Sequence, residues 1–203
     1  MLHFIEIRYF GWNVTTFTFL AVLFFGLYGA WGLYHQVKKL HVIGTKSVSV
    51  ITNLCYAAMF ITLLPYGIVM EQLAPCTQFL LRFPFVLFIL LKLYKGNGGF
   101  TKKEWSVAGM LVLVLLYMFI NVRLVSMVLL WVGAVAAVDQ PVQIWRNKTP
   151  GGVSVQAYWS FWWACVFWFA YGSVMKDIYI MSWSIAYVIV YSATIVLFYK
   201  HRN

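Results

Sequence analysis

Long apolar runs, separated by short polar gaps, fill almost the whole chain. Each run has close to the ~20 residues that an α-helix needs to cross a bilayer core about 30 Å thick. The pattern predicts an all-α membrane protein with seven transmembrane helices. They are expected at about residues 17–34, 48–70, 74–94, 105–121, 124–145, 153–175 and 178–199.

The least obvious boundary is at Asn121-Val122-Arg123, because the chain is apolar on both sides of it. Without a break there, one helix of about 40 residues would have to cross a core that needs about 20. We therefore expect a break, which makes the run before it a separate helix.

Composition agrees with this reading. The chain is 63% hydrophobic and only 10% charged, whereas a soluble domain carries about 25% charged residues. The net charge of +10 does not indicate a nucleic-acid partner, because the basic residues lie in short gaps between apolar runs. No nucleophile, base and orienting group have a spacing typical of an enzyme. We also expect no cofactor and no metal site.

The basic residues instead predict an orientation. Eleven lysines and arginines lie in the gaps on the side of the C-terminus, and three lie on the other side. Because cytoplasmic loops carry an excess of these residues, we expect a cytosolic C-terminus and an N-terminus outside or in a lumen. The membrane would be a cell's inner or plasma membrane, or that of a lysosome-like organelle.

The chain matches itself at a shift of 105 residues. The matches keep one register over 28 residues, which chance apolar similarity seldom does. They pair residues 48–50 with 153–155, Tyr66-Gly67 with Tyr171-Gly172, and Val69-Met70 with Val174-Met175.

This repeat predicts three parts. An N-terminal segment with the first three-helix repeat covers residues 1–94, a loop and linker helix cover 95–122, and the second repeat covers 123–203. A three-helix unit ends on the side opposite its start, so the linker must cross once more before the second unit begins. The repeats are therefore expected to be parallel, with a substrate between them near the midplane.

In both units a glutamine ends the first helix and a basic loop follows. The second copy has Pro141 and Gln143, and the first has His35-Gln36. These segments resemble the PQ-loop family, which includes the SWEET sugar transporters and the lysosomal cystine and cationic amino-acid exporters. Both copies depart from the family's Pro-Gln pattern, since His35 replaces the proline and Pro141 stands one residue early.

The resemblance implies a transporter that moves a small solute by alternating access, with Gln36, Pro141 and Gln143 at hinges or gates. Pro141 also frees the carbonyl of Ala137, which is compatible with a hinge or with a static kink. Alternatives on the same scaffold are a receptor and a lipid- or lipid-sugar-handling protein. The expected partners are a small-molecule solute and membrane lipid, and a homo-oligomer is left open.

Arg82 is the most informative single residue. It lies eight residues past Ala74, about 12 Å along a helix at ~1.5 Å per residue, and thus near mid-bilayer. An arginine at that depth costs at least about 2.5–3.5 kcal/mol, so it must face a cavity or an acidic partner. It could anchor a substrate anion through its guanidinium, or it could pair with Asp139, the only acidic residue well inside a predicted span.

The family resemblance places Arg82 at a pocket position. SWEET transporters carry a pocket tryptophan three residues before the Tyr-Gly of each unit, and a pocket asparagine about nineteen residues after it. The matching pairs here are Leu63 with Arg82 and Trp168 with Tyr187. The asparagines that hold sugar hydroxyls in the family are absent, which counts against a sugar. Arg82 with Trp168 and Tyr187 favours an anionic or zwitterionic solute with an apolar part.

Asp139 has three interpretations. Carboxylates inside membranes often relay protons, and cystine-type members of the family are proton-coupled. Pairing with Arg82 would instead keep Asp139 ionised. It could also be a solvated residue at a helix end.

Overall fold

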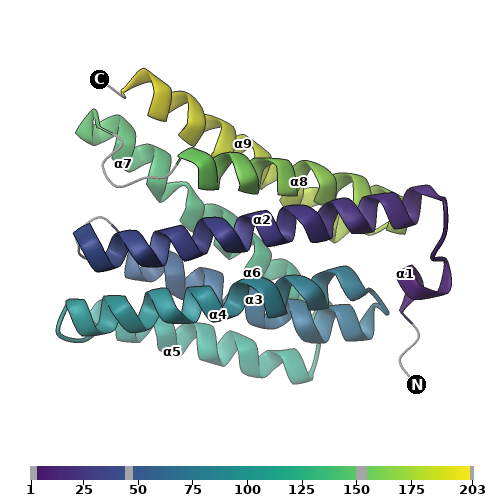
Figure 1. The fold of residues 1–203 in the computed structure, drawn as a ribbon. Helices are drawn as coiled ribbons and strands as arrows, with labels where there is room; N and C mark the ends of the chain where they lie inside the picture. Colours follow the sequence, from purple (N-terminus) through teal and green to yellow (C-terminus); the bar gives the residue numbers. More distant parts are fainter. Residues whose placement is uncertain (1–3, 44–47, 150–154, 202–203) are drawn as a thin grey trace.

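The computed structural model describes residues 4–43, 48–149 and 155–201, and all regular structure in these ranges is helical. Figure 1 shows the long helices running lengthwise between two ends. We call the end with α1 and the α3–α4 and α8–α9 turns the α1 end. The end with α7 and the C-terminus is the basic end. The helices are α1 (Ile5–Arg8), α2 (Val14–Ile43), α3 (Val50–Val69), α4 (Leu73–Gly96), α5 (Lys102–Leu116), the 3-10 helix η1 (Tyr117–Phe119), α6 (Val122–Ala137), α7 (Asp139–Asn147), α8 (Val155–Met175) and α9 (Ile178–Lys200).

The chain is an integral, multi-pass membrane protein. Within the described residues, five segments are long and apolar enough to cross a membrane: Val14–Lys38, Val50–Val69, Leu73–Gly96, Val122–Asn147 and Ile178–Lys200. Helices α8 and α5 are not among these five. Helix α8 has 21 residues but is rich in tryptophan and tyrosine, which lower its hydropathy, and α5 has only 15 residues. Apolar side chains that face outward suit hydrocarbon rather than water. On α2 these are Phe17, Leu20, Phe24, Leu27 and Trp31.

Local signals explain several helix boundaries. The expected break before α6 is confirmed, since η1 ends at Phe119 and Asn121 caps α6 by accepting a hydrogen bond from the N–H of Leu124 at 3.0 Å. The helix expected over 124–145 is divided at Val138 into α6 and α7. The division lies just before Pro141, where the missing backbone donor was expected to give a hinge or a static kink.

The first predicted helix differs from the observed one. Residues 17–34 were expected, whereas α2 runs without interruption through Gln36 to Ile43. His35 stands where the family pattern has a proline. Because His35 keeps its backbone N–H, it can make the helical hydrogen bond and the helix continues. The two units therefore differ in the helix that carries the glutamine.

The turns at the α1 end have the same geometry. Glu71 and Lys176 both adopt the left-handed region, with φ of 52° and 54°. In both turns the next residue donates its backbone N–H to the glycine of the Tyr-Gly pair at 2.8 Å. These bonds are Gln72 N to Gly67 O and Asp177 N to Gly172 O.

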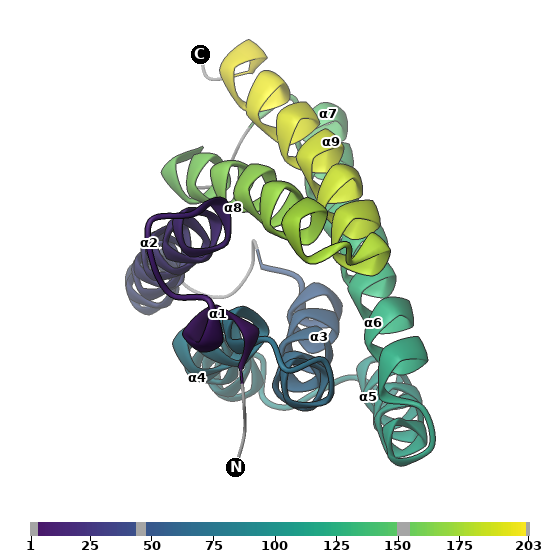
Figure 2. The same ribbon diagram turned by 90° about the vertical axis from the view of Figure 1, so that its right-hand side faces the viewer.

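The helix contacts follow one scheme on each side of the molecule. Helix α4 packs on α2 and α3, and α9 packs on α8 and α6. Across the middle, α2 packs on α8 and α3 packs on α6, as Figure 2 shows from one end of the bundle. Helix α5 packs on α3, where a small core of Cys55, Ala58, Leu111, Val125 and Leu129 joins α3, α5 and α6.

Candidate functional site

A pocket lies between α2, α3 and α4 on one side and α6, α8 and α9 on the other. Many of its lining residues are related by the sequence repeat. Ten of its lining residues are five pairs separated by 105 positions: Tyr56 with Phe161, Phe60 with Cys165, Leu63 with Trp168, Gln78 with Trp183, and Arg82 with Tyr187. We call this space the central pocket.

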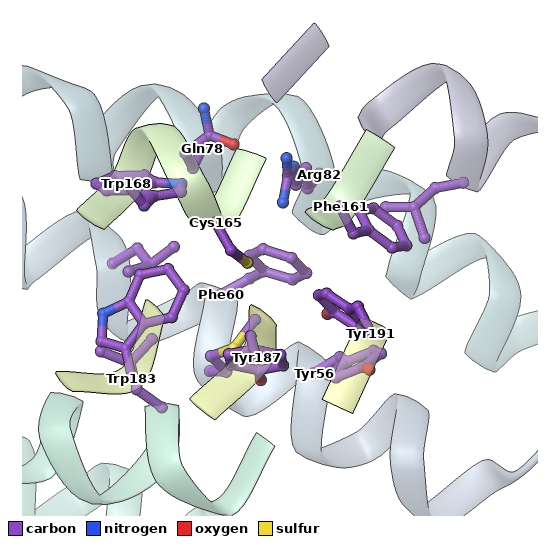
Figure 3. A pocket seen from close by; sticks show the side chains of 14 residues that line it. Tyr56, Phe60, Gln78, Arg82, Phe161, Cys165, Trp168, Trp183, Tyr187 and Tyr191 are labelled. Carbon is purple, nitrogen blue, oxygen red and sulfur yellow. Dashed lines mark hydrogen bonds between the residues drawn. The ribbon is translucent and has the colours of Figure 1, made fainter. Parts of the chain in front are cut away.

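The four residues that the sequence nominated for substrate binding all line the central pocket. Arg82, Trp168, Tyr187 and Leu63 are each at most 8% exposed. Figure 3 shows Arg82 beside the ring of Phe161, with Trp168 and Tyr187 on other parts of the wall. The structure thus brings together residues that are up to 124 positions apart in the chain.

Arg82 has no acidic partner among the described residues. Its Nη2 donates to the carbonyl oxygen of Phe25 at 3.2 Å, and its Cζ lies 5.5 Å from the ring centroid of Phe161. Its Nε is buried without a hydrogen-bond partner. A carbonyl and a ring face stabilise a guanidinium, but neither neutralises its charge.

The alternative pairing of Arg82 with Asp139 is wrong for this structure. Asp139 is the first residue of α7, is exposed, and accepts a hydrogen bond from Nε2 of Gln143 at 2.7 Å. It is also not the most buried acidic residue. Glu6 and Asp177, at 0% and 4% exposed, are buried at the α1 end.

Glycines of α2 make room for the polar side chains of α4. A Cβ at Gly29 would lie 2.6 Å from Nη2 of Arg82, and a Cβ at Gly26 would overlap the amide of Gln78. At Gly32 the glycine instead permits close packing of α2 on α8, since a Cβ there would lie 3.3 Å from that of Ala157.

A second pocket leads from the central pocket toward the basic end. It has an empty volume of about 800 Å³ and shares Leu33, Tyr56 and Phe161 with the central pocket. Gln36 and Asp139 also line it. Because they share these three lining residues, the two pockets adjoin each other.

The α1 end is closed by hydrogen bonds that join the two sides of the bundle. Oδ2 of Asp177, just before α9, accepts from the hydroxyl of Tyr66 on α3 at 2.5 Å and from Nε2 of Gln72 at 3.2 Å. Its Oδ1 accepts from the backbone N–H groups of Tyr179 and Ile180 at 3.1 Å each, which caps α9.

Glu6 makes the corresponding contacts for α4. Its carboxylate accepts from the backbone N–H groups of Leu73 and Ala74 at 2.9 Å each, and from the hydroxyl of Tyr171 on α8. We call Glu6, Tyr66, Gln72, Tyr171 and Asp177 the α1-end cluster.

The residues nominated for hinges or gates lie toward the basic end. Pro141 is buried in α7, Gln143 is bonded to Asp139, and Gln36 lies on the wall of the second pocket. Residues 44–47 and 150–154 lie outside the described residues, and so does most of the 153–155 match. No group of three or more His, Cys, Asp or Glu that could hold a metal ion occurs in the described parts of the chain.

Sequence reasoning missed Gln78, Trp183 and Glu6. The first two could have been found, because Gln78 precedes Arg82 by four residues and Trp183 precedes Tyr187 by four, which places each pair on one helix face. Glu6 had no such signal, since its partners are 67 or more residues away.

No protein-family model matches the chain, and no curated protein matches it in sequence. Among solved structures the chain is similar to a eukaryotic SWEET transporter determined at 3.7 Å resolution. The two share 14% sequence identity with a TM-score of 0.64, over 93% of this chain and 97% of the other. The chain therefore has a SWEET-like fold.

Proposed function

We propose that this protein is a membrane transporter that moves a small anionic or zwitterionic solute by alternating access. The observation that carries the proposal is Arg82, a buried cation without an acidic partner, facing a pocket between the two sides of the bundle. Buried charges are normally paired, so a substrate anion is the natural partner for this one.

Two parallel three-helix repeats joined by a linker helix explain the helix contacts. In this arrangement α2, α3 and α4 form the first repeat, α5 with η1 the linker, and α6–α7, α8 and α9 the second. The first helix of each repeat then packs on the second helix of the other. The five residue pairs in the central pocket and the two equal turns support the same symmetry.

Alternating access is supported by the contrast between the two ends. The α1-end cluster links the repeats and closes that end, while the second pocket extends the central pocket toward the basic end. The structure thus suits a state that is accessible from the basic end. In the opposite state the cluster would separate, and α7 would move about the break at Val138.

Asp139 is our candidate for proton coupling. It is exposed on the wall of the second pocket, where a proton can reach it from solvent, and Gln143 holds its carboxylate in place. Gln36, which also lines the second pocket, would take part in closing this path.

We also propose that the basic end faces the cytosol, from the eleven-to-three distribution of basic residues. Single cysteines at Trp12 and His201 should then react with an impermeant thiol reagent from opposite sides of the membrane. The native Cys55, Cys76 and Cys165 are buried and give a low background. Reaction of both new thiols from one side would contradict the orientation and the odd number of crossings.

The transporter proposal is tested by uptake into liposomes that contain the purified full chain. Labelled organic acids, amino acids and sugars are offered one at a time, with and without a pH gradient. We expect uptake of a carboxylate-bearing solute that the Arg82→Gln variant loses. Ligand binding without any uptake would indicate a receptor, and sugar uptake that survives Arg82→Gln would overturn the proposed substrate class.

A further inference from the structure

Helix α1 lies outside the repeated segment, yet it binds both sides of the bundle. Its Glu6 is fully buried, at 0% exposed. On one side is the start of α4, where the backbone N–H groups of Leu73 and Ala74 donate to the carboxylate at 2.9 Å each. On the other side is α8, whose Tyr171 donates its hydroxyl to the same carboxylate. Glu6 therefore joins the two sides across the closed α1 end.

The attachment of α1 to the two sides is unequal. Toward α4 it makes the two backbone hydrogen bonds of Glu6, and the N–H of Ile5 donates to the carbonyl oxygen of Glu71 at 2.8 Å. A short connection, residues 9–13, also joins α1 to α2. Toward α8, the hydrogen bond from Tyr171 is the single one found among the described residues. If the two sides separate, α1 should therefore stay with α2 and α4.

Separation would leave the carboxylate of Glu6 well stabilised. It keeps both backbone donors at the start of α4, where the helix dipole favours a negative charge. Only the hydroxyl of Tyr171 leaves, and water can take its place as the α1 end opens. Asp177 is arranged in the same way, because its two backbone donors belong to its own helix, α9. Opening at Glu6 thus breaks one hydrogen bond and does not strand a buried charge.

Tyr171 connects this hydrogen bond to the central pocket. Its ring centroid lies 5.6 Å from that of Trp168, with the two rings nearly perpendicular at 86°. Trp168 lines the pocket, and its ring centroid lies 5.7 Å from that of Trp183, which also lines it. The contact between Glu6 and Tyr171 is therefore one side chain away from the pocket wall, on the α1 side of it.

We propose that α1 is a latch on the α1 end. Glu6 holds Tyr171 and thereby sets the balance between the state that is open to the basic end and the state that is open to the α1 end. Glu6 is a positioning residue that acts through Tyr171 and touches no substrate. This inference rests on the proposed alternating access, and it adds a regulating element that comes from outside the two repeats.

The latch separates gating from folding stability. The hydrogen bonds of Glu6 to α4 are present in both states, so they cancel from the balance between the states although they stabilise the fold. Glu6→Ala and Tyr171→Phe both remove the bond that joins the two sides. They should therefore shift the balance by the same amount, whereas only Glu6→Ala also removes the cap of α4.

Cys165 is a native reporter of the balance. It lines the central pocket, and Figure 3 shows its sulfur beside the ring of Phe60. The full chain is placed in liposomes with known orientation, and a small membrane-impermeant thiol reagent is added on one side. Slow labelling of Cys165 is followed by peptide mass spectrometry, which distinguishes it from Cys55 and Cys76. The rate from each side follows the population that is open to that side.

For Tyr171→Phe we expect labelling from the α1 side to rise about tenfold, the equivalent of one hydrogen bond, and labelling from the basic end to fall. Glu6→Ala should give the same two changes with a lower melting temperature than Tyr171→Phe. The double variant should shift the labelling no further, because both changes remove one bond. Tyr9→Phe is the matched control on α1, where Tyr9 is 58% exposed, and it should change nothing.

Three outcomes would overturn the latch: unchanged labelling in Tyr171→Phe, faster labelling from both sides, which indicates a loosened fold, or additive shifts in the double variant. Uptake into liposomes keeps this result separate from the proposed function. Opposite changes in labelling without uptake of any solute would defeat transport and leave the latch standing. Uptake by the unaltered chain, with labelling that Tyr171→Phe does not change, would do the reverse.

Discussion

The two halves of the chain build the same turn at the α1 end with different side chains. In the second half Asp177 caps its own helix, α9, and accepts a hydrogen bond from Tyr66 of the other half. In the first half the equivalent residue is Gln72, whose side-chain amide donates a hydrogen bond to Asp177. Glu6 of α1 supplies the missing carboxylate to α4 and accepts from Tyr171 of the other half.

The difference shows that the repeat preserves an arrangement of charges more closely than it preserves residues. Each of the two helix starts has a carboxylate at its N–H groups, where the helix dipole favours negative charge. Each carboxylate also binds a tyrosine across the bundle. The carboxylate of Asp177 is next to the helix that it caps, whereas that of Glu6 comes from outside the repeated segment. An alignment of the halves therefore shows only that Gln72 is matched with Asp177.

The largest effect is expected for Asp177→Ala. The change removes a carboxylate that accepts four hydrogen bonds and leaves buried donors on Tyr66 and Gln72 without a partner. We expect a loss of about 3–5 kcal/mol, seen as a lower melting temperature of the detergent-solubilised protein. Asp139→Ala is the matched control, because Asp139 is exposed, and it should cost little. Equal losses in both variants would refute the role of the cluster.

The next effect is expected for Glu6→Ala, which removes three hydrogen bonds. A loss of about 2–4 kcal/mol should lower the melting temperature by roughly 10 °C. Glu6→Gln keeps the shape and one acceptor oxygen and should lose less. Glu71→Gln at the same end changes an exposed side chain and should lose almost nothing. If Glu6→Gln and Glu71→Gln behave alike, the carboxylate does not supply the cap of α4.

A smaller effect is expected for a change on α2 beside Arg82. Gly29→Ala places a Cβ 2.6 Å from Nη2 of Arg82, so the guanidinium must move. We expect about tenfold weaker binding of a carboxylate-bearing solute. Gly109→Ala on α5 meets nothing within 4 Å and should leave binding unchanged while adding about 0.5–1 kcal/mol of stability. The second half already has an alanine, Ala136, at the position that matches Gly29 when Gln36 is aligned with Gln143. Undiminished binding in Gly29→Ala would place Arg82 away from the ligand.

The smallest effect is a coupling energy near zero. Arg82 and Asp139 contact different groups, so Arg82→Gln and Asp139→Asn should add within about 0.5 kcal/mol in a double-mutant cycle on ligand-free protein. Arg82→Gln alone should not destabilise the protein, since it removes a buried charge that has no counter-charge. Mutual rescue in the double variant would show that the two side chains pair after all.

Much of the fold could be predicted from local signals. The break before Asn121 followed from the length a bilayer accepts, and the interruption ahead of Pro141 followed from a missing donor. The continuation of α2 past Gln36 was not expected, because the polar residues after it were read as a loop although they can remain helical.

The candidate site could be predicted in part. The resemblance and the depth of Arg82 nominated four residues that do share one pocket. The pairing of Arg82 with Asp139 could not be tested without coordinates, because two residues 57 positions apart can lie at similar depth on helices that do not present them to each other.

The membrane class, most helix boundaries and the internal repeat could be read from the chain alone, because hydrophobicity and proline act on their own segment. Which side chains meet, and that the two turns at the α1 end share one geometry, became known from the folded structure. Glu6 at the start of α4, Gln78 and Trp183 around Arg82, and the exposure of Asp139 all depend on how distant helices pack. Such contacts are set by the fit of whole helix surfaces rather than by the residues on either side of them in the chain.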